Sequence, residues 1–246
     1  MGGAARARGA RKGKPSQQKR RVLRVIAIDG PAAAGKSSVG RQVAAALGSR
    51  FLDTGAMYRA ITWTARHRGI DLSDDEALSE LAASVRMEIG PPAPGFLESC
   101  TIFVDGEDVT TRLRQPEVES AVSLVSSVPG VRTALVRAQR EMGSGQPLVM
   151  AGRDIGTVVL PQADLKLYLD ASVEERAQRR HRELSILGQK VTLETVLEDL
   201  RRRDRIDSRR SVSPLQVAED AIVIDTDGLT LDEVVRRVLE EVKGSA

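Results

Sequence analysis

Gly30-Pro31-Ala32-Ala33-Ala34-Gly35-Lys36-Ser37 decides the fold of this 246-residue sequence, because it fits the phosphate-loop pattern G-x-x-x-x-G-K-[ST] without a mismatch. The apolar run from Val25 to Asp29 precedes it and is typical of a strand buried in a parallel sheet. The residues from Lys36 to Leu47 then predict a helix. Strand, loop and helix in this order are the context that the motif requires. We therefore expect the loop to bind the phosphates of a nucleoside triphosphate.

Each part of the loop has its own chemistry. Gly30 and Gly35 allow turn conformations in which successive N–H groups converge on phosphate oxygens. The start of the following helix adds the positive end of its dipole. Lys36 would reach the β- and γ-phosphates, and the Ser37 hydroxyl would bind Mg²⁺. A chance match in a Gly/Ala-rich turn is the alternative, and the flanking strand and helix disfavour it.

The composition indicates an α/β protein with an aliphatic core. Hydrophobic residues make up 41% of the chain but aromatic residues only 2%, so Val, Leu, Ile and Ala must fill the core, as is usual for a parallel sheet between helices. The single cysteine, Cys100, excludes an internal disulfide and fits a reducing cytosol. No run approaches the roughly 20 apolar residues of a membrane span. We expect a cytoplasmic protein.

Charge is distributed unevenly along the chain. The first 24 residues hold nine Lys and Arg and no acidic residue, so subtracting nine from the net charge of +3 leaves the rest near −6. An acidic body argues against a protein whose main work is to bind nucleic acid. We interpret residues 1–22 as a disordered basic tail, with weak RNA contact as the minority alternative.

The rest of the chain predicts alternating strands and helices with one interruption. Strands are expected at 50–53, 148–151, 165–169 and 221–225. Helices are expected to begin near Thr54, Ser73, Pro116, Pro129, Ser172 and Thr230. Alternation at 85–89 and the hairpin signal Asp105-Gly106 predict a small antiparallel patch, so we interpret 70–112 as an insert. An arginine-dense helical segment covers about 176–210.

Polar side chains gather where the predicted strands end, which is where open α/β sheets bind ligands. They are Asp53, Arg59, Arg153 and Asp154, together with the arginines of 176–210. Taken singly, Asp53 also fits a helix cap and the arginines a solvated helix face. Taken together, they predict a site for more phosphate than one triphosphate carries.

Four motifs in series resemble those of the bacterial cytidylate kinases in order and spacing. They are Gly30-Pro31-x-x-x-Gly35-Lys36-Ser37-Ser38, Leu52-Asp53-Thr54-Gly55-Ala56-Met57-Tyr58-Arg59, Gly152-Arg153-Asp154-Ile155-Gly156-Thr157 and Arg203-Asp204-x-x-Asp207-Ser208-x-Arg210-Ser211-x-x-Pro214-Leu215. The resemblance covers about 24–243. It implies a P-loop nucleoside monophosphate kinase over 23–246, with a five-stranded parallel sheet, a small mixed α/β insert that binds the monophosphate and an arginine-rich helical lid.

The resemblance also implies the reaction and the residues that serve it. The γ-phosphoryl group of ATP would pass to CMP or dCMP, giving ADP and CDP or dCDP, with Mg²⁺ as cofactor, in a protein that needs only one chain. The implied catalytic cations are Lys36, Arg153, Arg203 and Arg210. The implied ATP-binding residues are Gly30, Pro31, Ala32, Ala33, Ala34, Gly35, Lys36, Ser37 and Ser38. The implied acceptor-binding residues are Thr54, Tyr58, Arg59, Ser123, Arg132, Arg153, Asp154, Arg203, Asp207 and Arg210. Ser37 would ligate Mg²⁺ directly, and Asp53 is a candidate ligand through a water molecule.

The sequence departs from the family pattern at two places in the loop. Ala32-Ala33 stands where relatives often carry Ser or Gly, and we expect little effect because backbone N–H groups bind the phosphates. Ser37-Ser38 replaces the common Gly-Thr pair, which leaves open which serine meets the metal.

Three alternatives remain at this point. One is a kinase for another small acceptor, either UMP or a metabolite hydroxyl for which Asp53 would be the base. Another is a GTP-dependent switch, which requires an N-K-x-D motif that the sequence lacks. The third is an RNA-binding protein acting through its tail. The lack of a motif histidine fits a monophosphate acceptor, because its second pKa near 6 leaves it anionic and without need of a base.

Overall fold

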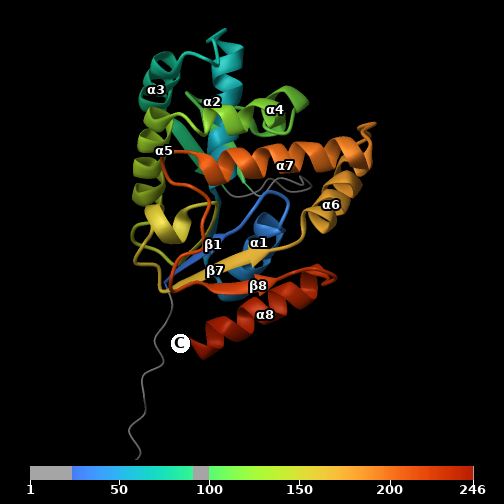
Figure 1. Cartoon of the computed structure of the whole chain (residues 1–246). Helices are drawn as coiled ribbons and strands as arrows, with labels where there is room; N and C mark the ends of the chain where they lie inside the picture. The colour runs from blue at the N-terminus through green and yellow to red at the C-terminus, as the bar shows by residue number, and fades with distance from the viewer. Residues whose placement is uncertain (1–23, 91–99, 246) are drawn as a thin grey trace, which may run out of the picture.

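The computed structural model describes residues 24–90 and 100–245 (Figure 1). The predicted tail at 1–22 and the predicted chain break at Pro91 to Gly95 lie outside these residues. The main sheet has the strand order β2-β6-β1-β7-β8, and every neighbouring pair is parallel. Its strands are β1 (Val25–Asp29), β2 (Arg50–Asp53), β6 (Leu148–Ala151), β7 (Leu165–Asp170) and β8 (Ile222–Asp225). The predicted five-stranded parallel sheet is confirmed, with the phosphate loop leaving its central strand.

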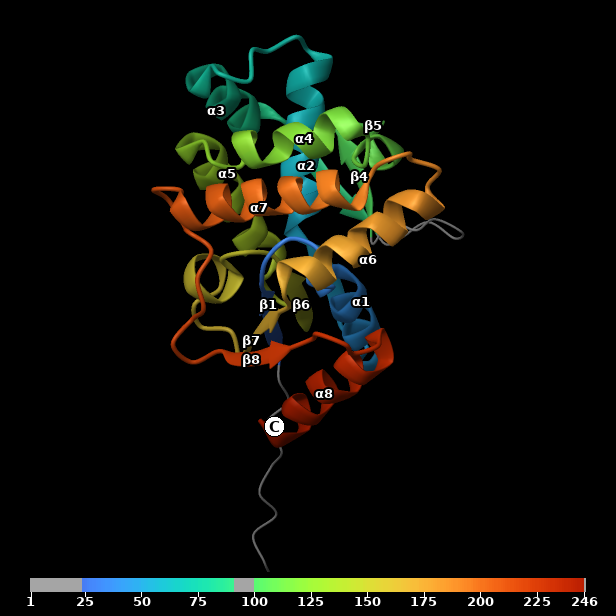
Figure 2. The ribbon, with the colours of Figure 1, turned by 45° about the vertical axis from the view of Figure 1, so that its right-hand side comes forward.

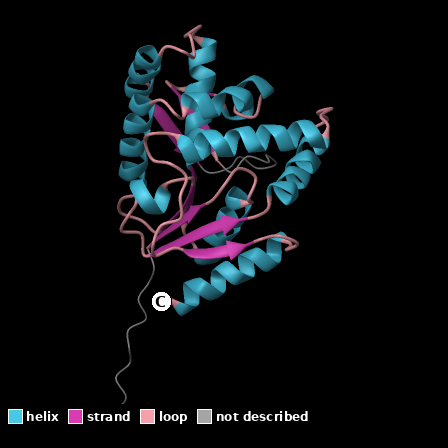
Figure 3. Cartoon of the chain, viewed as in Figure 1, coloured by secondary structure: helices cyan, strands magenta, loops and turns pink. Residues whose placement is uncertain are grey.

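Helices cover both faces of this sheet (Figure 3). They are α1 (Lys36–Leu47), α2 (Thr54–His67), α3 (Asp75–Ser84), α4 (Pro116–Val125), α5 (Pro129–Met142), α6 (Val173–Ile186), α7 (Leu193–Arg209) and α8 (Leu231–Gly244). Ile26 and Ile28 of β1 share a core with apolar residues of α1 and α8. Ala27 faces the opposite way and joins a core built with α2, α3, α4 and α5. The alternation of side chains along a strand thus gives β1 two buried faces.

A second, antiparallel sheet lies between α2 and α4 in the chain. Its strands are β3 (Met87–Gly90), β4 (Thr101–Val104) and β5 (Glu107–Asp108), in the order β3-β4-β5. Asp105 and Gly106 connect β4 to β5 with φ angles of 50° and 86°. Positive φ at both central residues is what a two-residue hairpin turn of this kind requires. The antiparallel patch and its turn, both predicted from sequence, are confirmed.

Helices α6 and α7 pack against each other, and α7 also packs against α4. In Figures 1 and 2, α7 runs between α4 and the main sheet. The apolar residues between α6 and α7 form a small cluster of Ala177, Leu184, Val196 and Leu200, and Ala32 of the phosphate loop belongs to it. The helical pair is therefore in direct apolar contact with the loop.

Two helices begin with an aspartate cap, and one of them confirms that Asp53 fits a helix cap. Asp53, rather than Thr54, caps α2, because its carboxylate accepts a hydrogen bond from the Gly55 N–H at 3.0 Å. The Thr54 hydroxyl instead donates to the carbonyl oxygen of Ala151 at 2.9 Å. Asp74, one residue later than the expected Ser73, caps α3. In both places an aspartate carboxylate holds the cap position, one of the strongest capping groups.

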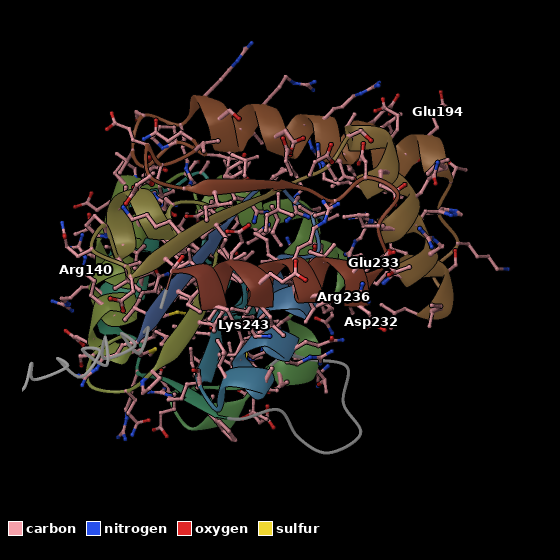
Figure 4. The ribbon with its side chains drawn as sticks, turned by 90° about the horizontal axis from the view of Figure 1, so that it is seen from below. Arg140, Glu194, Asp232, Glu233, Arg236 and Lys243 are labelled. Carbon is pink, nitrogen blue, oxygen red and sulfur yellow. The ribbon has the colours of Figure 1, made fainter. Side chains whose placement is uncertain are left out.

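The closing helix agrees with its sequence signature. Thr230 and Glu233 form the predicted capping box at the start of α8, and Val234, Val238 and Val242 bury its apolar stripe. Figure 4 shows α8 from below, with Glu233 near one end and Lys243 toward the other. No helix in the described part of the chain is long and apolar enough to cross a membrane.

Candidate active site

A cleft of about 590 Å³ lies between the phosphate loop, the start of α2, helices α4 and α5, and the α6–α7 pair. The predicted site residues that line it are Ala32, Ala33, Ala34, Gly35, Lys36, Ser37, Ser38, Asp53, Thr54, Tyr58, Arg59, Ser123, Arg132, Arg153, Asp154, Arg203, Asp207 and Arg210. Gly30 and Pro31 do not line it. The structure therefore brings residues from widely separated motifs to one cavity.

The phosphate loop owes its shape to backbone conformations that favour glycine. Gly30 has a φ of 145°, and a Cβ there would lie 2.1 Å from the carbonyl oxygen of Leu169, so only glycine fits. Gly35 has a φ of 87°, and Ala33 holds a φ of 60° despite its side chain. The loop then leads directly into α1, whose first N–H groups are free to bind an anion.

Lys36 is buried at the base of the loop. Its ammonium donates to the carbonyl oxygen of Pro31 at 2.5 Å. Burial lowers the pKa of Lys36 well below its usual value, and the nearby charge of Arg153 adds to this, while Asp53 and Asp29 oppose it. A phosphate group at the loop would act in the same direction as these carboxylates and favour the charged ammonium.

Asp53 lies across from the first turn of α1. The Ser37 hydroxyl donates to its Oδ2 at 2.8 Å, while Oδ1 caps α2. Burial tends to raise the pKa of Asp53, but Arg59, Arg114 and the Ser37 hydroxyl outweigh it and lower the pKa. Asp53 is therefore an ionised carboxylate, and of the two loop serines it is Ser37 that contacts it.

A buried charge network forms the far end of the cleft. Arg132 is only 1% exposed and donates to Asp154 Oδ2 and, at 3.2 Å, to the carbonyl oxygen of Ser126. Its guanidinium lies 5.4 Å from the centre of the Tyr58 ring. Burial raises the pKa of Tyr58 to about 12, so its phenol stays protonated. Arg210 Nη2 approaches the other oxygen of Asp154 at 3.7 Å.

Asp207 joins two of the predicted cations. Arg153 Nε donates to its Oδ2 at 2.9 Å, and Arg210 Nη1 lies 3.9 Å from its Oδ1. Asp154 and Asp207 therefore place Arg132, Arg153 and Arg210 in one connected set. Two other predicted cations, Arg59 and Arg203, instead meet at Glu119.

The turn that carries Arg153 and Asp154 was not predicted in this form. Residues Ile155–Val159 make one turn of π-helix, and Asp29 at the end of β1 accepts hydrogen bonds from the N–H groups of Ile155 and Gly156 at 2.8 and 2.7 Å. Burial raises the pKa of Asp29 to about 6, although these two hydrogen bonds lower it. Asp29 thus connects the strand before the phosphate loop to the turn that carries Arg153 and Asp154.

Sequence reasoning missed several polar residues of the cleft, of which Glu119 and Arg114 are the most prominent, whereas Arg180 is one of the predicted arginines of 176–210. Glu119 was detectable, because it lies one helical turn before Ser123 and must share its face of α4. Arg176 was noticed only as part of a basic helix. It is buried, and it donates to the carbonyl oxygen of Ala32 and forms an ion pair with Asp204 at 2.7 Å. Its contact with Ala32 shows that this departure from the family pattern lies at a packed position.

Comparisons with known proteins agree with this geometry. The family model described as Cytidylate kinase matches residues 26–244. A cytidylate kinase of Caldanaerobacter subterraneus subsp. tengcongensis is 48% identical over 218 residues, which cover 89% of this chain and 94% of that protein. The chain belongs to the cytidylate kinase family. The family predicted from the four motifs is confirmed, and with it the class of enzyme, a phosphotransferase.

A second relative is much longer than this chain. A bifunctional pantoate ligase/cytidylate kinase of Synechococcus sp. (strain JA-3-3Ab) is 52% identical over 227 residues, which are 92% of this chain but 42% of that protein, so the chain spans less than half of it. Among solved structures, shikimate kinase from Acinetobacter baumannii in complex with shikimate is 22% identical, covers 90% of this chain and 94% of its own, and has a TM-score of 0.44. A TM-score of this size carries no argument about substrate.

Proposed function

We propose that this chain transfers the γ-phosphoryl group of ATP to CMP or dCMP, giving ADP and CDP or dCDP. The observation that carries the proposal is that the phosphate loop and the buried Asp154–Arg132 pair face the same cleft. One end of the cleft suits a triphosphate and the other offers a carboxylate and a guanidinium to a nucleobase. Membership of the cytidylate kinase family supports this choice of base.

Base choice follows from hydrogen-bonding chemistry. Cytosine presents an amino donor where uracil presents a carbonyl acceptor, so a carboxylate facing that edge favours cytosine. Asp154 is the carboxylate that we assign to it, with Arg132 and Ser123 serving the other base atoms. Arg132 and Arg210 already contact Asp154 from either side, which fixes the position of the carboxylate.

Phosphoryl transfer needs positive charge and alignment but no general base. At neutral pH the acceptor phosphate is already an anion because its second pKa is near 6. Lys36, Arg153, Arg203 and Arg210 supply charge to the transferring group. Arg59 holds the acceptor phosphate, and arginine suits these positions because its planar fork binds phosphate bidentately. Thr54, Tyr58 and Asp207 complete the acceptor side.

The loop residues fit Mg²⁺. The hydroxyl of Ser37 and the carboxylate of Asp53 are hard oxygen donors 2.8 Å apart beside the loop, which is the kind of ligand that Mg²⁺ prefers. We assign the direct ligand to Ser37 and a water-mediated contact to Asp53. A bound Mg²⁺ would neutralise charge on the β- and γ-phosphates.

The same proposal assigns moving parts to the chain. Residues of about 176–210, which include most of α6 and all of α7, act as a lid that closes over the phosphates and excludes water. Residues of about 70–112 form the insert on the acceptor side. The lining of the cleft comes from one chain, so a monomer suffices for the reaction.

A panel of nucleoside monophosphates tests the proposal. The full chain is supplied with ATP and Mg²⁺ and offered CMP, dCMP, UMP, AMP or GMP in turn, and ADP release is followed with a coupled assay. We expect CMP and dCMP to be turned over with the highest kcat/KM, and Lys36→Ala to abolish the rate with each of them. A higher kcat/KM for UMP or a purine monophosphate contradicts the proposal.

A further inference from the structure

Glu119 lines the cleft, but the proposed reaction assigns it no role. It lies on α4, its side chain is only 12% exposed, and it contacts four arginines. Its Oε2 is 3.2 Å from Arg203 Nη1 and 3.3 Å from Arg180 Nη2. Its Oε1 is 3.6 Å from Arg114 Nη1 and 3.8 Å from Arg59 Nε. One carboxylate therefore stands among guanidinium groups from four parts of the chain.

These arginines come from opposite sides of the cleft. Arg59 is in the first turns of α2, and Arg114 precedes α4 by two residues. Arg180 and Arg203 belong to α6 and α7, the pair that packs over the phosphate loop. Figure 2 shows α7 running alongside α4, and the two helices are in contact. Glu119 therefore links the acceptor side to the helical pair.

The balance of charge indicates that Glu119 brings the four guanidinium groups together. Four guanidinium groups repel one another, and long arginine side chains lose rotamer freedom when fixed. A carboxylate at their centre offsets part of this repulsion, and two of the four arginines have a further carboxylate partner, Arg59 with Asp53 at 3.6 Å and Arg180 with Glu183 at 2.8 Å. Burial tends to raise the pKa of Glu119, but Arg59, Arg203, Arg114 and Arg180 outweigh it and hold the pKa at about 2. The carboxylate is ionised at any working pH.

The distances between Glu119 and its arginines indicate attraction that does not hold each guanidinium group in one position. Charge-assisted N–H···O hydrogen bonds are about 2.7–2.9 Å long, whereas Arg203 and Arg180 donate to Glu119 at 3.2 and 3.3 Å. Arg114 and Arg59 lie at ion-pair distances of 3.6 and 3.8 Å from Glu119 Oε1. A guanidinium group can therefore turn toward a phosphate and keep most of its attraction to Glu119. By contrast, Arg132 and Arg153 each donate a short hydrogen bond to an aspartate.

We propose that Glu119 is a positioning residue, which gathers arginines of the α6–α7 pair and of the acceptor side into one cluster so that they converge on the substrate phosphates. Its role in turnover rests on the proposed function, but its stabilising contacts with α6 and α7 do not. Glu119 acts through Arg203 and Arg59 and takes no part in the bonds that form or break.

Glu119→Gln tests the proposal, with Glu117→Gln as the matched control because Glu117 is an exposed glutamate on the same helix. We expect kcat/KM for CMP to fall about 10- to 100-fold in Glu119→Gln, chiefly through higher KM for both nucleotides, because misplaced binding groups cost about this much. Glu119→Asp keeps the charge and should recover part of the loss. The control should keep wild-type kinetics.

Hydrogen exchange gives a readout that does not depend on the substrate. We expect faster amide exchange in α6 and α7 of Glu119→Gln, but not of Glu117→Gln, with little change in the central strands. If CMP is not the substrate and exchange still rises in α6 and α7, the proposed function fails and the role of Glu119 stands.

A double-mutant cycle with Arg203→Gln completes the test. If the two residues act together, the loss in kcat/KM caused by Arg203→Gln is smaller in the Glu119→Gln background than in the wild type. Lower KM values in Glu119→Gln would show that Glu119 competes with phosphate, which overturns the proposal. Unchanged kinetics and exchange in that variant would also overturn it.

Discussion

The phosphate-loop end of the cleft and the end around Asp154, which we propose binds the base and call the base-binding end, are built by different means. At the loop end, a continuous segment presents backbone N–H groups, and its shape depends on Gly30 and Gly35. At the other end, side chains from separate elements are held by ion pairs, with Arg132 from α5, Asp154 from the turn after β6 and Arg210 from the end of α7. One end of the cleft is thus built from local backbone structure, and the other from a network of side chains that are far apart in the sequence.

This difference explains which amino-acid substitutions each end of the cleft tolerates. A backbone site keeps its hydrogen-bond donors when most of its side chains change, so only the glycine positions and Lys36 are strict. A network of buried charges depends on every member, because removing one partner leaves another charge buried and unpaired. We therefore expect substitutions at the loop end to act on one chemical step, and substitutions at the base-binding end to act on both substrate choice and packing.

Lys36→Ala should produce the largest effect. The variant should fold normally and lose roughly 10³-fold or more in turnover, because a positive charge aimed at the transferring phosphoryl group disappears. Steady-state kinetics with CMP and a melting curve measure the two quantities. Lys243→Ala is the control, since Lys243 is exposed on α8 away from the cleft (Figure 4). Near-native turnover in Lys36→Ala would exclude the loop as the phosphate site.

Asp154→Asn tests the base-binding end. If Asp154 faces the cytosine edge, the ratio of kcat/KM for CMP to that for UMP should fall by about 10²-fold, because an amide no longer distinguishes the two bases as a carboxylate does. The structure also gives Asp154 a packing role through Arg132 and Arg210. An equal fall for both substrates would assign Asp154 to that network alone. Asp232→Asn, an exposed site on α8, is the control.

The two ends also differ in how far sequence could predict them. The loop, α1 and the strands on either side of it follow from contiguous patterns, and α1 has the predicted limits, Lys36 and Leu47. Placing the base-binding residues in one cleft required the family resemblance, because Arg132, Asp154 and Arg210 are separated by 22 or more residues. Their ion pairs are invisible in local periodicity.

Some features were beyond sequence reasoning for physical reasons. The π-helical turn after Asp154 depends on a carboxylate 126 residues away, Asp29. The sequence left the cap of α2 open between Asp53 and Thr54, and Asp53 holds it while the threonine hydroxyl donates to Ala151 on β6. The place of Glu119 on the cleft side of α4 was detectable from its spacing to Ser123, but its arginine partners were not, because they belong to four different segments. In each case a tertiary contact decides what the local sequence leaves open.

Asp29, at the end of the strand before the phosphate loop, accepts hydrogen bonds from the turn after Asp154 and so connects the two ends of the cleft. Its titration tests how buried this connection is. Burial raises its folded-state pKa from 3.8 to about 6, so the native protein binds the extra proton and is more stable below that pH. As pH rises from 5 to 7 this stabilisation is lost, on the order of 1 kcal/mol. Asp29→Asn cannot titrate, so urea unfolding should show the wild type losing stability relative to the variant over this range. A constant difference between them would contradict the raised pKa.

Ala33→Gly should have the smallest effect and the opposite sign. Ala33 holds a φ of 60°, which costs a residue with a Cβ roughly 1–2 kcal/mol, while glycine adds about 0.4–1 kcal/mol of unfolded-chain entropy. These backbone terms favour the variant by about 0.5 kcal/mol, and losing the partly buried methyl group of Ala33 against the α6–α7 cluster offsets part of this gain. The free energy of unfolding should therefore rise by less than about 0.5 kcal/mol. Its neighbour is the matched control. Ala32 has no positive φ, and its buried methyl group packs against Ala177 and Leu184 between α6 and α7. Ala32→Gly should therefore lower the free energy of unfolding by about 1–2 kcal/mol.

Urea unfolding of both variants measures the two changes. Destabilisation by both would show that the loop end also depends on its side chains at Ala33, and that the contrast between the two ends of the cleft is weaker than the backbone geometry indicates.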